Sequence, residues 1–373
     1  MTCRCSQDFI VEACDLTSGT VRAVLDPISM DWQTGLNQWG QGTLMLATKD
    51  LKIRDIWPGL TSIYISRTSG GGGASRTNPV AEFAGMAESV NATEAGTTTL
   101  GMVSIESYLN RRSLKDDLEF TEVDQTEIGA ELVRAAEFNG IPLFAEAASS
   151  DQPRDRRYPP WNRKIIGEAL EDLSQVINGV DWEISHTRAN GRWSTTMTFR
   201  DFAGVDRSEE IRLESDRELS AYALTIDGVD QATWVDAIGS GEEEDQLLAT
   251  AIDGSGIYPE FDATPAWKDV TRIGTLQDHA DGYLADYREP RAAPTFTIAG
   301  LDPSPSLMRN GDIVHVRQDF GALSFHGDAR IITSSWALGE NEPISRTYEV
   351  LPLVRASQSV LNQTATERCK GGC

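Results

Sequence analysis

The apolar segments of this chain are short, and turn-forming residues separate them. Four such segments in the first 66 residues are bounded by Gly, Pro, Asp or Asn: 9–14, 19–25, 43–47 and 62–66. Segments of this length and composition are typical of β-strands. They are far shorter than the ~20 apolar residues that span a bilayer. The first residues also lack the cationic start and apolar block of a signal peptide. We therefore expect a β-rich chain without a membrane anchor.

Three stretches show helical rather than strand periodicity: 121–137, 165–177 and 275–288. In the first two, apolar residues recur every three or four positions, which predicts amphipathic helices. Asp124 is placed to cap the first helix, with Glu127 three residues later as a capping box. Both helices and the strand segment 180–185 lie between β-rich parts. The sequence therefore predicts an α+β, β-rich fold that contains an α/β insert.

No segment carries a recognisable catalytic motif. The histidines form neither His-x-x-x-His nor His-Glu-x-x-His, and there is no Gly-x-Ser-x-Gly elbow. The four histidines, at 186, 279, 315 and 326, are scattered; we expect His279 and His315 to be packed or half-exposed, and packing roles in the core or at an interface for Trp32, Trp39 and Trp57. We therefore expect no catalytic residue, no resident cofactor and no cofactor-binding residue, so that the chain is not an enzyme.

Three segments of unusual composition are interpreted as loops. The Gly-rich segment 69–75 lacks the Lys-Ser/Thr of a phosphate-binding loop, which favours a flexible hairpin tip. The polar, Arg-containing segment 149–160 is interpreted as a solvated surface loop, with phosphate binding as the alternative. The acidic run 242–245 is interpreted in the same way, with a weak cation site as the alternative because it lacks the spacing of a calcium loop.

The five cysteines lie only near the two ends of the chain. Cys3 and Cys5 would point to one face of a strand, and Cys369 and Cys373 are one helical turn or one small Gly loop apart. If the two ends meet, these four thiolates could form a tetrahedral zinc or iron–sulfur site. A disulfide and free thiols remain as alternatives. Cys14 lies in an apolar segment and is expected to be a small core residue.

The chain is strongly acidic, with a net charge of −24 from 57 acidic and 33 basic residues. This balance disfavours broad nucleic-acid binding, because such binding needs Lys and Arg to neutralise phosphates. The simplest interpretation of the charge is that it keeps the chain in solution.

A distinctive order of elements fills the last third of the chain. Its parts are a strand segment at 221–227, an acidic Gly-punctuated loop at 239–245, a helix at 275–284 closed by Pro290, a strand at 294–299 and the turn Asn310-Gly311-Asp312 before a strand at 313–316. Upstream, the segment 58–67 and the Gly-x-Asp-Trp-Glu step at 179–183 fit the same order. This order resembles the hub (minor tail) proteins at the tip of long-tailed bacteriophages, which share a fold with the baseplate hubs of contractile tails.

The resemblance implies two tube-like β domains with an α/β insert. The expected domains are 1–112, completed by 200–240, then the insert 113–199, and 241–373 with one helix and a C-terminal tail. The family forms homotrimers that adapt a six-fold tail tube to a three-fold tip. Its neighbours are the distal tail protein, the tape measure protein and a tip or fibre protein.

The implied location is the virion, at the tail tip, after synthesis in the host bacterial cytoplasm. DNA would pass through without specific binding, and an acidic channel lining would then keep phosphates from adhering. The alternatives to a structural hub are a cell-wall hydrolase and a carbohydrate-binding adhesin of the tail tip.

Overall fold

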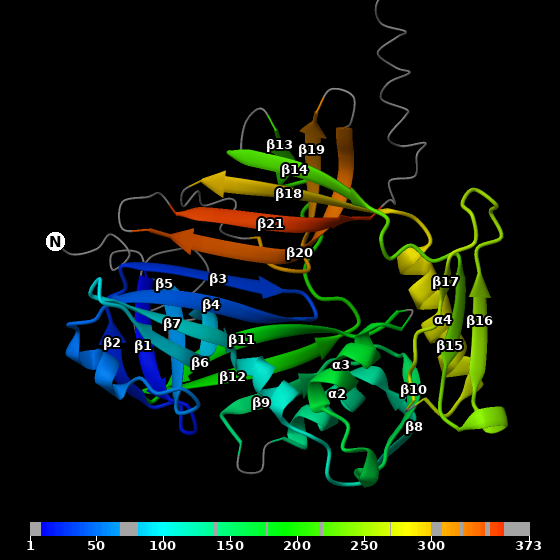
Figure 1. Cartoon of the computed structure of the whole chain (residues 1–373), viewed down its shortest axis with the longest axis horizontal. Coiled ribbons are helices and arrows are strands. Elements are labelled where there is room, and N and C mark those ends of the chain that lie inside the picture. Colours follow the sequence, from blue (N-terminus) through cyan, green and yellow to red (C-terminus); the bar gives the residue numbers. More distant parts are fainter. Residues whose placement is uncertain are drawn as a thin grey trace, which may run out of the picture.

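The computed structural model describes residues 9–67, 81–136, 140–176, 178–215, 219–268, 270–299, 308–320, 324–339 and 344–353. Thirteen of its strands form one sheet (Figure 1). Eleven follow the order β14-β18-β21-β20-β3-β4-β7-β6-β5-β1-β2, and β19 and β13 branch from β20. These strands are β1 (Phe9–Asp15), β2 (Val21–Leu25), β3 (Ser29–Gly35), β4 (Gln38–Ala47), β5 (Thr61–Arg67), β6 (Ala81–Ala92), β7 (Thr97–Ser104), β13 (Arg212–Glu214), β14 (Ala221–Asp227), β18 (Arg291–Ala299), β19 (Ile313–Asp319), β20 (Ser324–Leu338) and β21 (Ser345–Pro352).

The β-rich prediction is confirmed, and several predicted strands coincide with β1, β5, β14, β18 and β19. β7 and β21 bury every second residue, as expected of strands with one face in the core, whereas β1 and β5 are buried on both faces. The seam between β3 and β20 joins residues that are some 300 positions apart in sequence. Trp32 on β3 and Trp336 on β20 stack with ring centroids 5.4 Å apart, and Phe9 packs edge-on against Trp32 at 5.6 Å. This aromatic cluster fixes the seam from its buried side.

A second body, which we call the insert, packs below the large sheet in Figure 1. Its helices α2 and α3 cover two small sheets and share one apolar core, which includes Ile128, Leu132, Leu170 and Phe199. Its elements are β8 (Leu118–Asp124), α2 (Gln125–Arg134), β9 (Leu143–Ala147), β10 (Pro153–Tyr158), α3 (Ile166–Ser174), β11 (Asp181–Ala189) and β12 (Arg192–Arg200), with a 3-10 turn at Pro160–Asn162. The other 3-10 turns of the chain are Leu51–Asp55, Ile105–Arg111 and Glu243–Asp245.

The predicted start of the first helix is confirmed at Asp124. Its carboxylate accepts hydrogen bonds from the Thr126 backbone N–H at 2.9 Å and from the Thr126 hydroxyl at 2.7 Å. These contacts satisfy a backbone donor that the first helical turn leaves open. Glu127 pairs with Arg134 at 3.7 Å on the solvent side of the helix.

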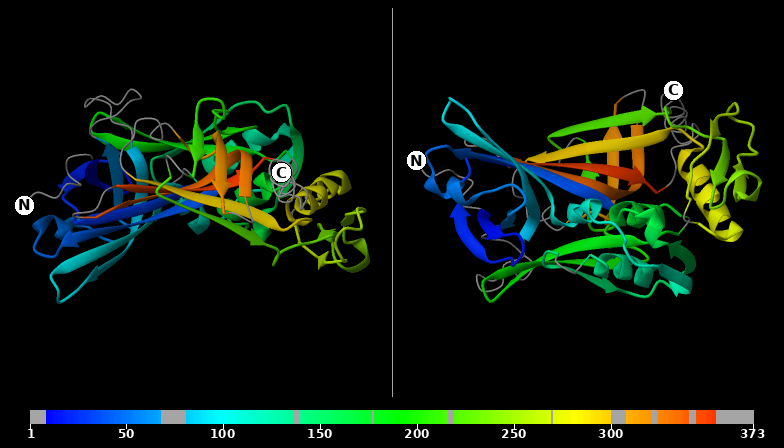
Figure 2. Two further views of the ribbon diagram at one scale, coloured as in Figure 1. Left: turned by 90° about the horizontal axis from the view of Figure 1, so that it is seen from above. Right: turned by 60° about the horizontal axis from the view of Figure 1, so that its bottom comes forward.

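A third body contains α4 (Ile273–Tyr287) against a small sheet of β15 (Trp234–Ile238), β16 (Leu248–Ile252) and β17 (Asp262–Ala263). It has its own core, in which Val235, Ala249 and Leu276 are buried. Both views in Figure 2 place this body at the end of the molecule opposite β1 and β2. No helix in the described part of the chain is long and apolar enough to cross a membrane.

The interpretation of residues 149–160 as a solvated loop is wrong. Residues 153–158 form β10, which pairs with β8, and Arg154, Asp155 and Arg156 are all less than 9% exposed. Their charges are met by α4 and the residue before it: Arg154 lies 2.8 Å from Asp278, and Asp155 pairs with Arg272.

The contact between β10 and α4 also buries His279, which was predicted to be packed or half-exposed. The Arg156 guanidinium lies 3.1 Å from His279 Nε2, and Trp267 stacks on the His279 ring at 4.4 Å. Burial, with Arg156 and Arg154 nearby, lowers the pKa of His279 to about 2. The strand was missed because its charges are compensated by residues more than a hundred positions away.

A buried ion pair joins the insert to the large sheet. Asp181, at the start of β11, pairs with Arg330 on β20 and accepts hydrogen bonds from the Asn37 amide at 2.7 Å and the Ala203 backbone N–H at 3.0 Å. The predicted turn at residues 310–312 lies beside it. Gly311 has φ +95°, and a Cβ there would lie 2.5 Å from the Ala203 carbonyl oxygen. Glycine is therefore required at this close approach.

The boundaries expected at 112/113, 199/200 and 240/241, and the tube-like character of the two β domains, stay predictions.

Candidate functional site: the open face of the central sheet

Opposite the aromatic cluster, the large sheet presents a face of small neutral side chains. Strand register aligns two rows across it, which we call the open face. The first row crosses seven strands with Val103, Gln41, Gln33, Ser335, Thr347, Thr297 and Ala221. The second crosses five strands with Gly101, Thr43, Asp31, Ala337 and Ser345. Successive side chains of a strand point to opposite faces of the sheet, so the residues between those of the two rows face the core.

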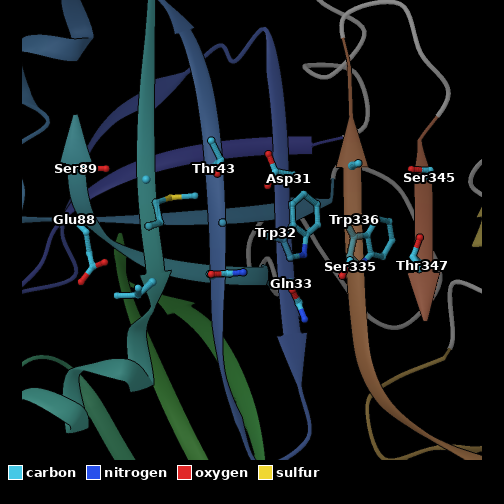
Figure 3. A pocket seen from close by; sticks show the side chains of 16 residues that line it. Asp31, Trp32, Gln33, Thr43, Glu88, Ser89, Ser335, Trp336, Ser345 and Thr347 are labelled. Atoms are coloured by element: carbon cyan, nitrogen blue, oxygen red, sulfur yellow. The ribbon is translucent and has the colours of Figure 1, made fainter. Parts of the chain in front are cut away.

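The middle of the open face is hollowed where β3 and β20 meet. The hollow has a volume of about 490 Å³ and is lined by sixteen residues from β3, β4, β6, β7, β20 and β21. Figure 3 shows the side chains of Gln33, Thr43 and Thr347 at this surface. Gly42 and Gly101 contribute backbone in place of side chains.

The electrostatics of the open face are weakly acidic. Its two rows contain one charged residue, Asp31, and no Lys or Arg. Partial burial raises the pKa of Asp31, and a hydrogen bond with Thr43 opposes that shift. Glu88 adds a second carboxylate to the lining of the hollow, and it pairs with Arg111 on the outer side.

The hydroxyl groups of the open face bond to one another. Thr297 and Thr347, on neighbouring strands, have their hydroxyl oxygens 2.9 Å apart. Cross-strand Thr pairs of this kind stabilise a sheet while leaving the surface neutral. The two rows form a broad polar wall without Lys or Arg, so they lack the positive charges needed to hold a polyanion.

Sequence reasoning did not identify the open face. The side-by-side position of Gln33 and Ser335 depends on the pairing of β3 with β20. Alternation of polar residues in 31–33, 41–43 and 345–347 was the available signal.

The proposed metal ligands Cys3, Cys5, Cys369 and Cys373 lie outside the described residues, so the zinc or iron–sulfur site stays a prediction. The Gly-rich segment 69–75 also lies outside them. In the part of the chain that the structure describes, no group of three or more His, Cys, Asp or Glu side chains is arranged to hold a metal. Cys14 is fully buried, as predicted, and burial raises the pKa of its thiol to about 12.

Other sequence predictions can be placed at specific sites. His186 is buried and its Nδ1 lies 2.9 Å from the Thr195 hydroxyl; His315 is partly exposed beside Asp328 at 2.7 Å. The position of His315 agrees with the prediction of a packed or half-exposed histidine. Glu242, Glu243 and Asp245 are exposed, which confirms a solvated loop at these residues.

The tryptophan predictions are confirmed in part. Trp32 is buried, and Trp39 stacks on Trp182 with ring centroids 5.8 Å apart. Trp57 is 65% exposed and so lies outside the core. A role for Trp57 at an interface stays a prediction.

Neither a family model nor a curated protein sequence matches this chain. Similarity is found among solved structures. A tail protein from Neisseria meningitidis MC58 superposes with a TM-score of 0.60 over 95% of this chain and 98% of that protein, at 13% identity. The chain has a phage tail protein fold.

Two further structures agree over nearly the whole chain. The 43 kDa tail protein of prophage MuSo2 from Shewanella oneidensis has a TM-score of 0.60 and 10% identity, with 93% of this chain and 97% of that protein covered. The prophage tail protein gp18 from Listeria monocytogenes EGD-e has a TM-score of 0.52 and 12% identity, with 98% and 100% covered. The fold of the tail proteins therefore accounts for the large sheet, the insert and the α4 body together.

Proposed function

We propose that this chain is a structural protein of a phage tail and that the open face lines a channel. The observation that carries the proposal is the end-to-end correspondence with tail proteins, which covers 98% of the Neisseria protein as well as 95% of this chain. A shared fold alone does not fix a function. The chemistry of the open face supplies the second argument.

A channel that passes DNA needs a wall to which phosphates do not bind. Protein affinity for DNA arises mainly from Lys and Arg, which release counterions when they neutralise phosphates. The open face has neither residue in its two rows, and Asp31 repels phosphate. Its hydroxyl and amide groups keep the wall wetted. A polar, weakly acidic sheet face is therefore suited to the passage of DNA without specific binding.

The finer assignment is a homotrimeric hub at the distal end of the tail. Three copies around one axis would adapt the six-fold tube to a three-fold tip, with a distal tail protein on one side and a tip or fibre protein on the other. The tape measure protein and DNA would leave through the central opening. A closed ring of this kind requires the same surfaces of each copy to meet in a cyclic order.

The oligomeric state tests this assignment. We expect native mass spectrometry of the purified chain, alone or with its neighbouring tail proteins, to give three copies, and electron microscopy to show a three-fold ring whose opening faces β3 and β20. A chain that stays monomeric beside those proteins, or a ring with the open face outward, would contradict it.

Basic substitutions on the open face test the channel lining. In phage particles that carry Gln41→Lys and Thr347→Lys, we expect DNA release to slow by about tenfold at low salt and to recover at high salt, because added phosphate contacts are salt-dependent. Release is followed by the fluorescence of a DNA-binding dye. The control places the same charges on the insert, as Ser185→Lys and Thr187→Lys, both on exposed parts of β11. Equal slowing in both variants would remove the channel assignment.

Exposed tryptophans favour one alternative, a carbohydrate-binding adhesin. Trp161 is 71% exposed and Trp57 is 65% exposed, and flat aromatic rings of this kind can stack on sugars. Loss of cell or glycan binding in Trp57→Ala or Trp161→Ala, with the oligomeric state unchanged, would support that role. A cell-wall hydrolase would instead release products from purified peptidoglycan.

A further inference from the structure

The outer strand of the α4 body, β16, has an edge that no described strand pairs with. The sheet order is β16-β15-β17, so β16 is bonded to β15 on one side only. Figure 1 shows it at the outer margin of the molecule. Protein edges are usually protected by Lys, Pro or a bulge, because an open edge can pair with another chain. The sequence of β16, Leu-Ala-Thr-Ala-Ile, has no Lys or Pro, and its register with β15 is regular.

The phase of the β15–β16 ladder shows which backbone groups face outward. Backbone hydrogen bonds join Asp253 N–H to the Thr233 carbonyl at 2.8 Å, and Gly239 N–H to the Leu247 carbonyl at 2.8 Å. In an antiparallel ladder bonded pairs alternate with unbonded pairs. The N–H and C=O groups of the alternate residues 248, 250 and 252 therefore point to the free edge.

One of these outward acceptors is already occupied within the chain. The Gln277 side-chain amide on α4 donates to the Thr250 carbonyl at 3.1 Å and to Asp281 at 3.0 Å. A single flexible amide can be displaced by a backbone N–H. The remaining outward groups give an added strand the start of a hydrogen-bonded ladder.

The outer face of β16 is apolar. Leu248 is 56% exposed and Ile252 is 52% exposed, whereas Ala249 and Ala251 between them are buried under α4. Ile257, in the loop that follows, is 71% exposed. An added strand with apolar residues at alternate positions would extend this face and cover these side chains.

The surroundings of β16 are acidic. From residue 228 to residue 267 the chain contains no Lys or Arg, and its nine acidic residues are Asp230, Asp236, Glu242, Glu243, Glu244, Asp245, Asp253, Glu260 and Asp262. Lys268 follows this segment directly, and Arg288 interacts with Asp253. Pairing of β16 with β16 of a second copy would bring two acidic regions together, which like-charge repulsion opposes. Charge complementarity instead selects a basic partner.

We propose that β16 is a docking edge for an extended segment of another protein, with apolar residues at alternate positions and Lys or Arg at its flanks. The segment adds as a strand beside β16, its apolar side chains lie beside Leu248 and Ile252, and its basic flanks face the acidic loop at 242–245 and Asp253. This surface lies outside the open face, and the proposal does not depend on the channel assignment.

Synthetic peptides test the proposal on the full chain. The probe is Lys-Arg-Val-Thr-Val-Thr-Ile-Arg-Lys with a fluorescent label; one comparison peptide has Glu at all four flanking positions, and another carries N-methyl groups on alternate amides. We expect the basic peptide to bind at least about tenfold more tightly than either comparison peptide, and more weakly at high salt. Equal binding by the N-methylated peptide would overturn strand addition, and equal binding by the acidic peptide would overturn the charge assignment.

Thr250→Pro is the matched variant. Its N–H points outward, so proline removes a group that the β15–β16 ladder does not use, and proline is tolerated at such edge positions. We expect peptide affinity to fall by at least about tenfold. Thr250→Val keeps the N–H and loses the same hydroxyl, and should bind within about twofold of the unaltered chain.

Circular dichroism and the oligomeric state show whether each variant is folded. If Thr250→Pro is unfolded, Leu248→Lys takes its place, because it leaves the backbone unchanged and should still weaken peptide binding. If the unaltered chain self-associates and Thr250→Pro abolishes this association, the occupant of the edge is a second copy of the chain, and the proposal is overturned. Unchanged peptide binding by a folded Thr250→Pro or Leu248→Lys variant would also overturn it.

Discussion

Replacing Asp181 with alanine is expected to lower the free energy of unfolding by about 3 kcal/mol, because it removes the buried carboxylate that compensates the charge of Arg330, whose side chain is only 16% exposed. Asp181 is 6% exposed and joins β11 of the insert to β20 of the large sheet. Its loss also removes the acceptor for the Asn37 amide and the Ala203 N–H. Chemical denaturation monitored by tryptophan fluorescence measures the change.

The surroundings of Arg330 explain why the penalty should be large. Its guanidinium donates to the Ala203 carbonyl at 2.6 Å and the Gly311 carbonyl at 3.1 Å, and it lies 3.8 Å from the centre of the Phe202 ring. These contacts hold the guanidinium in place after the carboxylate is gone. A largely buried charge that is held away from water keeps much of its desolvation penalty.

An exposed ion pair on the same strand provides the control for Asp181→Ala. Glu183 lies 2.9 Å from Arg200, and the two side chains are 40% and 45% exposed. Glu183→Ala should therefore change stability by no more than about 1 kcal/mol. Combining Asp181→Ala with Arg330→Met should restore part of the loss, since no unpaired charge remains buried. Equal effects of Asp181→Ala and Glu183→Ala would show that the junction does not depend on this pair.

Whether an interaction could be predicted from the sequence depends on how far apart its residues lie along the chain. Short apolar segments predicted β1, β5 and β14, and the Asp124 cap was recognisable because it depends on adjacent residues. The burial of Arg154 and Arg156 was not predictable in this way, since their partners lie on α4, more than 120 residues later. A charged pattern normally indicates a solvated segment. The compensating groups become visible only in three dimensions.

For the open face and the edge of β16, the residue types could likewise be predicted from the sequence, but their spatial arrangement could not. The sequence contains the neutral polar residues of the open face, but only the β3–β20 pairing places Gln33 beside Ser335. The acidic loop at 242–245 was visible as a charge run, whereas the open edge beside it depends on the order of three strands. Residue chemistry was therefore predictable, and its assembly into surfaces required tertiary structure.

The second large effect is expected at Glu106, where substitution should stabilise the protein. At pH 8, Glu106→Gln is expected to raise the free energy of unfolding by about 3 kcal/mol relative to the unaltered chain. Glu106 is 4% exposed, and burial raises the pKa of its carboxyl from the ordinary 4.5 to about 7, although a hydrogen bond with Ser104 opposes the shift. Among the described residues its Oε2 has no hydrogen-bond partner. Glutamine keeps the shape of the side chain and removes the charge.

The direction of the pH dependence follows from the raised pKa of Glu106. The folded state favours the protonated carboxyl, so its contribution to stability is fully present below pH 4.5 and is lost as pH rises through about 7. The advantage of Glu106→Gln should therefore be small near pH 4.5, grow between pH 4.5 and 7, and level off above pH 7. Denaturation midpoints and slopes at several pH values give this difference directly.

Comparing the variant with the unaltered chain also removes the contribution of His186, a second buried titratable group. Burial lowers the pKa of His186 from 6.5 to about 4, so its neutral form is favoured and stability falls as pH decreases through this range. That loss is present in both proteins and cancels in the difference. Glu88→Gln, the same change at an exposed carboxylate, should alter stability by less than about 0.5 kcal/mol. A Glu106→Gln difference that is flat between pH 4.5 and 8 would mean that this carboxyl stays ionised in the fold, with its charge compensated despite burial.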